Sequence, residues 1–262
     1  MLKRRVIVVL YLLDGFMTRS EVFRIHQLLG HPIHHVERLV EWDVDELIVI
    51  DISTDTPKFD TDRDDYRYKG PKDLLGFIHQ ISSNCRIPLT FGGRIRTMED
   101  IQLRIQNGAD KVTLNAVLDE SPDLVREAAE KFGSQAIVAS IDFTRDGDTA
   151  EVVTHHATKR QGVTPVEWAK RAEKLGAGEI FLNAVDRDGK ASGFDVDVIQ
   201  SVVDAVSIPV IACGGAGHPR HFLACLEQTN VAAVAAGNTF HFTENAYPNL
   251  KTFLKSKRDD IR

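Results

Sequence analysis

The chain has few cysteines, no excess of basic residues and no paired metal-ligand spacing. Its three cysteines, Cys85, Cys213 and Cys225, lie far apart, so neither a disulfide framework nor a zinc ribbon is indicated. The net charge of −6 and the calculated pI near 5.9 argue against nucleic acid as a partner. These absences predict a protein of the reducing cytoplasm that binds neither nucleic acid nor a membrane.

Neither a cleavable leader nor a low-complexity tract is expected from the sequence. The basic start, Met1–Arg5, precedes the apolar run Val6–Leu10, but this run is short, has no small-residue cleavage site and soon reaches Asp14-Gly15. We interpret the run as the first strand. A composition of 43% hydrophobic and 27% charged residues is typical of a soluble chain with a sizeable core. One domain over residues 1–262 is expected.

Short apolar runs alternate with amphipathic segments along the whole chain. The expected strands are Val6–Leu12, Glu46–Asp51, Ile87–Phe91, Lys111–Leu114, Ile137–Asp142, Glu179–Leu182, Ile208–Ala212 and Val231–Val234. The expected helices are Pro32–Asp43, Pro71–Ser83, Thr97–Asn107, Ser121–Phe132, Thr164–Leu175, Asp195–Val206, Pro219–Glu227 and Tyr247–Lys255, with a loop from Gly15 to His31. Strands that are apolar on both faces predict a parallel sheet, and eight units of this length close it into an α/β fold, the (β/α)8 TIM barrel.

An internal repeat indicates that the barrel consists of two half-barrels. Ile87–Gly93 resembles Ile208–Gly215, and Glu46-Leu47-Ile48 resembles Glu179-Ile180-Phe181. Chance similarity between strand-loop pieces is the alternative. With a true repeat, each half has its own ligand site at the end of its strands.

Glycine-rich turns follow three consecutive strands in the second half. Glycine lets the backbone approach an anion closely and turn its N–H groups toward it, although plain turn geometry also uses glycine. The predicted phosphate-binding residues are Gly189, Gly214, Gly215, Gly217, Gly237 and Asn238. In the first half, Gly92, Gly93 and Asn115 predict a second site, so the ligand is expected to be long, with phosphates at both ends.

Several motifs together resemble one family over nearly the whole chain. They are Arg5-Val6-Ile7, Asp45-Glu46-Leu47, Gly108–Val112, Phe132–Ala136, Ile141-Asp142, Gly178-Glu179-Ile180, Asp186–Gly189, Gly214–Gly217 and Phe240-His241-Phe242. This set resembles HisF, the cyclase subunit of imidazole glycerol phosphate synthase. The sister isomerase shares the repeat, but Gly133-Ser134-Gln135 and Asp186–Gly189 fit the cyclase better. The resemblance implies a barrel that takes ammonia from a glutaminase subunit and uses it to close an imidazole on a ribonucleotide with two phosphates; no cofactor is expected.

The resemblance implies two catalytic aspartates, at the ends of the first and fifth strands. Asp142 matches the second, with an ordinary strand-end carboxylate as the alternative, but Tyr11 occupies the first position. Tyrosine, with a reference pKa of about 10, is a poor base, so a step that needs a carboxylate should slow by about 10²–10⁴. Asp14 belongs to the following turn and is not expected to substitute.

Positions that the resemblance assigns to substrate contact also differ from the family. Arg94 replaces a third glycine and either grips a phosphate or blocks the site. Asn183 and Lys190 replace threonines, and the flexible first loop keeps a cation as Arg19. An insertion over residues 56–69 carries many charges and is expected on the catalytic face.

Four charged residues begin the first, second, fourth and sixth strands. They are Arg5, Glu46, Lys111 and Glu179, and they predict a ring of paired charges across the barrel floor. By resemblance the ring is the family's salt-bridge gate for ammonia, and Asp110 matches a position that faces the glutaminase. A purely structural floor is the alternative.

The histidines do not predict a metal site. His26, His31, His34, His35, His155 and His156 lack an associated carboxylate or cysteine pattern. No metal is therefore expected.

A kept charge ring and a lost carboxylate together resemble the HisF-like paralogues found with sugar amidotransferases of bacterial surface polysaccharide synthesis. The sequence therefore favours a subunit that supplies ammonia from a glutaminase for amidation of a phosphorylated or nucleotide-linked sugar. A histidine-pathway cyclase is the first alternative. The second is a non-catalytic barrel that only binds a phosphorylated ligand or acts as a scaffold.

Overall fold

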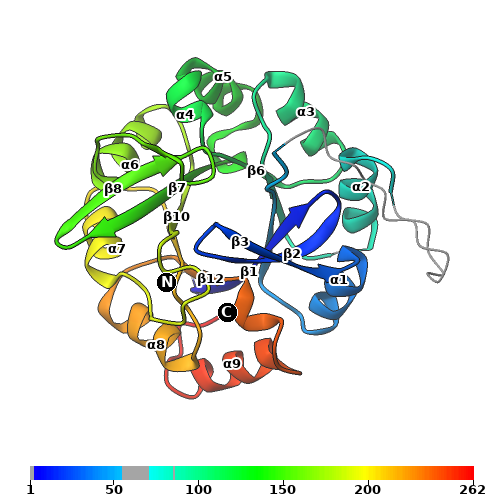
Figure 1. The fold of residues 1–262 in the computed structure, drawn as a ribbon, viewed down its shortest axis with the longest axis vertical. Helices are drawn as coiled ribbons and strands as arrows, with labels where there is room; N and C mark the ends of the chain where they lie inside the picture. Colours follow the sequence, from blue (N-terminus) through cyan, green and yellow to red (C-terminus); the bar gives the residue numbers. More distant parts are fainter. Residues whose placement is uncertain (1–2, 55–70, 85) are drawn as a thin grey trace.

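The computed structural model describes residues 3–54, 71–84 and 86–262, and the charged insertion predicted over 56–69 lies outside them. Eight parallel strands form a ring in which β12 pairs with β1 (Figure 1). They are β1 (Arg5–Leu13), β4 (Glu46–Asp51), β5 (Leu89–Gly92), β6 (Lys111–Leu114), β7 (Ile137–Asp146), β10 (Glu179–Ala184), β11 (Val210–Cys213) and β12 (Ala233–Ala236). The predicted (β/α)8 barrel is confirmed.

Helices surround the ring of strands (Figure 1). Their bounds are α1 (Pro32–Glu41), α2 (Leu74–Asn84), α3 (Met98–Gln106), α4 (Val117–Glu120), α5 (Pro122–Phe132), α6 (Pro165–Lys174), α7 (Val196–Val203), α8 (Pro219–Gln228) and α9 (Ala246–Lys255), with 3-10 turns η1 (Ser134–Ala136) and η2 (Asn238–Phe240). Several predicted helices were one residue too long at the start because the first residue is the N-cap. Thr97 and Thr164, for example, each form a capping box with the acidic residue three positions later.

The expected loop from Gly15 to His31 was wrong, because this segment forms two antiparallel strands. β2 (Phe16–Glu21) pairs with the end of β1, and β3 (Ile25–Gly30) pairs with β2. A second hairpin was also missed: β7 runs on to Asp146 and is followed by β8 (Thr149–Thr154) and β9 (Lys159–Arg160). β3 is largely exposed, so it lacks the apolar run by which the barrel strands were found.

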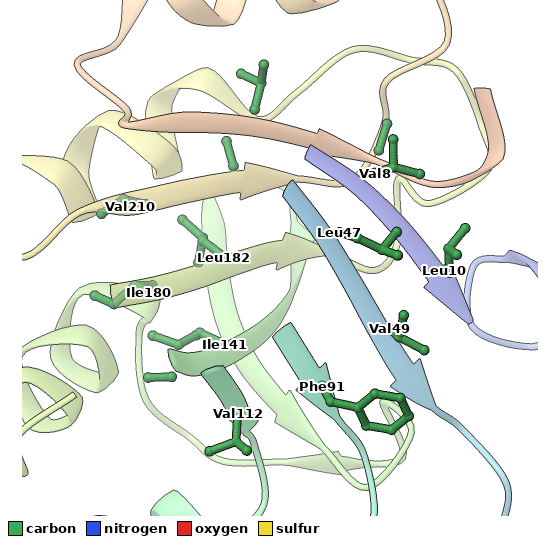
Figure 2. Packing of buried hydrophobic residues seen from close by; sticks show 14 of the residues in the cluster. Val8, Leu10, Leu47, Val49, Phe91, Val112, Ile141, Ile180, Leu182 and Val210 are labelled. Carbon is green, nitrogen blue, oxygen red and sulfur yellow. The ribbon is translucent and has the colours of Figure 1, made fainter. Parts of the chain in front are cut away.

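Two apolar layers result from the alternation of side chains along each barrel strand. Val8 and Leu10 belong to the layer between strands and helices, part of which Figure 2 shows. Ile7, Val9 and Tyr11 belong to a second cluster, inside the ring, with residues of β4, β7, β10, β11 and β12, and this cluster gives the bore an apolar lining. The bore therefore separates a floor at the start of the strands from a mouth at their carboxyl ends.

Candidate functional site

Asp142 lies on β7 at the barrel mouth, between two amide side chains. Asn115 Nδ2 donates to its Oδ2 over 3.1 Å, and Asn183 Nδ2 donates to its Oδ1 over 3.0 Å. Burial raises the pKa of Asp142 to about 6, although both hydrogen bonds act in the opposite direction. A carboxyl that titrates near neutral pH is suited to general acid or base chemistry.

Tyr11 occupies the predicted first catalytic position at the end of β1. Its ring is 3% exposed and meets the ring of Phe23 edge to face, with centroids 5.4 Å apart. Burial raises the pKa of Tyr11 well above 10, and the charges of Asp188 and Asp142 act in the same direction. The phenol is therefore neutral at physiological pH and is unsuited to act as a base. Asp14 is exposed in the turn after β1.

Asp188 is a buried carboxyl that the sequence reasoning missed. It follows β10, is 9% exposed, and has no hydrogen-bond partner for Oδ2 among the described residues. Burial raises its pKa to about 7, and the charge of Asp142 adds to the effect. The run Asp186–Gly189 contains this carboxyl, but only its glycine was interpreted as a functional residue.

A cavity of about 700 Å³ opens at the mouth beside Asp142. Its wall includes the predicted residues Gly93, Arg94, Asn115 and Asn183. The Nδ2 groups of both asparagines are used by Asp142, which limits their predicted role as donors to a substrate or phosphate. Arg94 is exposed and has a φ of 55°, a conformation that favours glycine.

Gly92, which was predicted to bind phosphate, is not among the residues that line this cavity. A Cβ at position 92 would lie 2.1 Å from Thr113 Cγ2, so glycine is required there for strand packing.

The predicted phosphate site of the second half is also not part of this cavity's wall, and its glycines make close backbone contacts. A Cβ at Gly214 would lie 2.4 Å from the Ala184 oxygen, and one at Gly215 would lie 2.2 Å from the Gly193 oxygen. Gly217 N donates to His221 Nδ1 over 3.3 Å, so this N–H does not point to a ligand as predicted.

The two predicted cations near this second site also lie apart from the cavity wall. Lys190 is exposed. Arg19 is in β2, not in a loop, where its guanidinium lies 3.6 Å from Glu21 and 5.1 Å from the ring centre of Phe242. Phosphate binding by the second half stays a prediction.

The floor of the barrel is closed by a ring of four charges. Lys111 Nζ lies 2.9 Å from Glu46 Oε1 and 2.7 Å from Glu179 Oε2, and the Arg5 guanidinium bridges the same two carboxylates. The glutamate side chains are only 3% and 7% exposed. Asp110 is exposed beside the ring and accepts from Leu89 N over 2.8 Å.

The chain is similar in sequence to known proteins. A family model described as "Histidine biosynthesis protein" matches residues 5–246. A relative from Metallosphaera sedula, named imidazole glycerol phosphate synthase subunit HisF, is 39% identical over 262 residues and 100% of both chains. The chain belongs to the HisF family. Relatives of the same name from Pyrococcus furiosus and Dehalococcoides mccartyi are 39% and 36% identical over 100% of this chain and 99% of theirs.

The described residues of this HisF-family chain include no cluster of metal ligands. Within the described ranges, no group of three or more His, Cys, Asp or Glu side chains could hold a metal ion. His155 and His156 line the cavity, and His155 Nε2 lies 2.7 Å from Glu120 Oε1. Among the helices that the structure describes, none has the length and apolar character of a membrane span.

The buried carboxyl of Asp142 is expected to make this HisF-family barrel less stable as the pH rises. Between its ordinary pKa of 3.8 and the folded value of about 6, the folded chain holds a proton that the unfolded chain has released. Its contribution to the free energy of unfolding is therefore complete below about pH 4 and is lost as the pH rises through about 6.

Asp142→Asn removes this titration. The free energy of unfolding of the variant, relative to that of the wild type, should therefore rise by about 2 kcal/mol between pH 4 and pH 7.5. Urea unfolding at both pH values measures the difference. Asp14→Asn, an exposed carboxyl on the same rim, is the matched control and should show no such change. An Asp142→Asn effect that is equal at both pH values would show that packing, not ionisation, is responsible.

Proposed function

We propose that this protein is the ammonia-accepting barrel subunit of a glutamine amidotransferase, and that a HisH-like glutaminase docks on its floor. The observation that carries the proposal is the closed ring of Arg5, Glu46, Lys111 and Glu179. Replacing buried ion pairs by apolar residues is often neutral or stabilising, so a barrel that needs only a closed floor has no use for four charges. Passage of ammonia does need a polar closure that can move.

The ring also lies in the right place for this role. It is at the amino ends of the strands, below the apolar bore, whereas Asp142 is at the opposite end. Asp110 extends the charged surface outward from the ring. Ammonia released at the floor would therefore reach a carboxyl that titrates near neutral pH.

The relatives are named imidazole glycerol phosphate synthase subunit HisF, which supports imidazole ring closure on a ribonucleotide as the reaction at the mouth. Asp142 supports the same candidate, since it provides one of the two carboxylates that the chemistry uses.

Tyr11 favours a second candidate, amidation of a phosphorylated or nucleotide-linked sugar in surface polysaccharide synthesis together with a sugar amidotransferase. A neutral, buried phenol where the cyclase needs a carboxylate is a specific disadvantage for ring closure. It does not affect delivery of ammonia. A barrel that only binds a ligand would not need the ring, so we do not favour a scaffold.

Substitutions in the ring test the proposed delivery of ammonia. Glu46→Gln and Lys111→Met keep side-chain size but break the ring, so glutamine-driven turnover in the complex with the glutaminase should fall about 10-fold or more. Turnover with added ammonium salts should stay within about threefold, because external ammonia enters at the mouth. Both ammonia sources are measured in the same preparation.

Lys159→Met is the matched control, since Lys159 forms an exposed ion pair with Asp119 away from the floor. It should leave both rates unchanged. Equal losses with glutamine and ammonium in Glu46→Gln and Lys111→Met would make the ring a structural floor and refute the proposal.

A further inference from the structure

Several ionisable side chains line the cavity at the mouth, but few of them can exchange a proton with a ligand. Among the described residues they are Asp51, Arg94, Arg96, Asp142, His155 and His156. The two arginines stay protonated at physiological pH. Asp51 is 3% exposed, its Oδ1 accepts from Ser53 Oγ over 2.6 Å, and its Oδ2 is buried. Asp142 and the two histidines remain.

The two histidines lie in the turn between β8 and β9 and differ in their contacts. The ring of His155 uses both nitrogens, because Nδ1 lies 3.0 Å from Thr154 Oγ1 and Nε2 lies 2.7 Å from Glu120 Oε1. His156 is exposed at the cavity, and its ring makes no hydrogen bond within the part of the chain that the structure describes. The imidazole of His156 is therefore free to contact a ligand.

The hairpin holds His156 close to the level of Asp142. β8 runs antiparallel to β7 with Val153 opposite Asp142, and the turn begins directly after β8. In this turn His155, His156 and Ala157 have φ values of 54°, 55° and 60°, in the left-handed region that residues other than glycine seldom adopt. Strained backbone of this kind is concentrated at functional sites. The turn thus presents an imidazole to the cavity at a conformational cost.

The chemistry of ammonia requires a second proton-transfer group beside Asp142. When ammonia replaces an oxygen on carbon, a base takes a proton from the nitrogen as the C–N bond forms, and an acid gives a proton to the oxygen as the C–O bond breaks. The buried, neutral phenol of Tyr11 is unsuited to this exchange. Asp14 and Asp188 are not among the described residues that line the cavity. His156 is the remaining candidate on its wall.

We propose that His156 is a catalytic residue that performs the second proton transfer, in place of the carboxylate missing from β1. The inference rests on the proposed function and deepens it, since it applies to ring closure and to sugar amidation alike. Asp142 and His156 would act on the same ligand from the barrel wall and from the hairpin turn, within a cavity of about 700 Å³.

The groups around His156 favour its neutral form. Its pKa is lowered from the usual 6.5 by partial desolvation and by His155, whereas the charge of Asp51 acts in the opposite direction. His26 of β3 also interacts with His156, and two histidines disfavour each other's charged forms. At physiological pH the imidazole is thus able to accept a proton, and it then becomes the acid.

His156→Gly with added imidazole tests the proposal in the full chain. Glycine suits a φ of 55°, so the backbone of the turn is kept. The assay is ammonium-driven turnover of the histidine-pathway ribonucleotide, for which the wild type should show a low but measurable rate. His156→Gly should lower this rate by about 10-fold or more. Free imidazole should then raise the rate of the variant by about threefold or more, because it can enter the vacated place and exchange the proton.

The same substitution in Tyr11→Asp separates a catalytic from a structural role. With a carboxylate restored on β1, loss of His156 should cost no more than about threefold, so the two substitutions are not additive. His26→Asn is the matched control, at an exposed histidine of the same rim that does not line the cavity. It should stay within about threefold of the wild type and should not respond to imidazole.

Equal losses in the wild type and in Tyr11→Asp, or a loss that imidazole does not reverse, would make His156 a structural residue of the turn. A wild type without measurable turnover would also overturn the inference, since a working replacement for the carboxylate must leave some activity. None of these results bears on ammonia delivery through the floor, which only the comparison of glutamine with ammonium tests.

Discussion

Tyr11→Asp is expected to raise ammonium-driven cyclase turnover by about 10²-fold over the wild type. The substitution restores a carboxylate at the end of β1 and removes the phenol, which is neutral because burial raises its pKa. It also removes a bulky ring near Gly237, where an added Cβ would lie 3.8 Å from Tyr11 Cε2. The assay uses the histidine-pathway ribonucleotide with saturating ammonium, so that it does not depend on the glutaminase.

Tyr11→Phe is the matched control, because it keeps the ring and removes only the hydroxyl group. A neutral phenol is not a base, so this variant should turn over at the wild-type rate. A wild type that turns over as fast as Tyr11→Asp would contradict the prediction. It would also identify ring closure, rather than sugar amidation, as the reaction of this barrel.

Asp142→Asn is expected to lower the same ammonium-driven turnover by about 10²–10⁴. Asparagine keeps the size of the side chain but cannot exchange a proton. The loss is best measured both in the wild type and in Tyr11→Asp, where the higher rate widens the range of the assay. If Asp142 acts as a base, the turnover of proteins that keep Asp142 should rise with pH through about 6 and then level off.

Asp14→Asn again provides the control, since Asp14 is an exposed carboxyl in the turn after β1. It should leave the rate within about threefold of the wild type. If Asp14→Asn lost as much activity as Asp142→Asn, the turn carboxyl would have replaced the missing residue of β1, and the assignment of Asp142 as the principal acid or base would be wrong.

The sequence alone determined the barrel, because the patterns that indicate its strands and helices are local and repeat along the chain. Strands such as Glu46–Asp51 are apolar on both faces and recur between amphipathic helices, which leaves few arrangements other than a closed parallel ring. The charges of the floor were also predictable, since Arg5, Glu46, Lys111 and Glu179 all begin strands that must start at the same end of the barrel. Neighbouring parallel strands bring such residues together, independently of the conformation of the loops between them.

Only the tertiary structure decided the properties of the mouth. β2 and β3 form because β1 offers an edge for pairing, and β3 has no buried apolar face that a local pattern could reveal. The raised pKa values of Asp142 and Asp188 come from burial by residues far away in the chain. The hydrogen bond that Asn238 Nδ2 donates to the Ser20 oxygen likewise joins residues 218 positions apart. Strand ends predict where a ligand site lies, but loops that fold across the mouth determine how much of it is open.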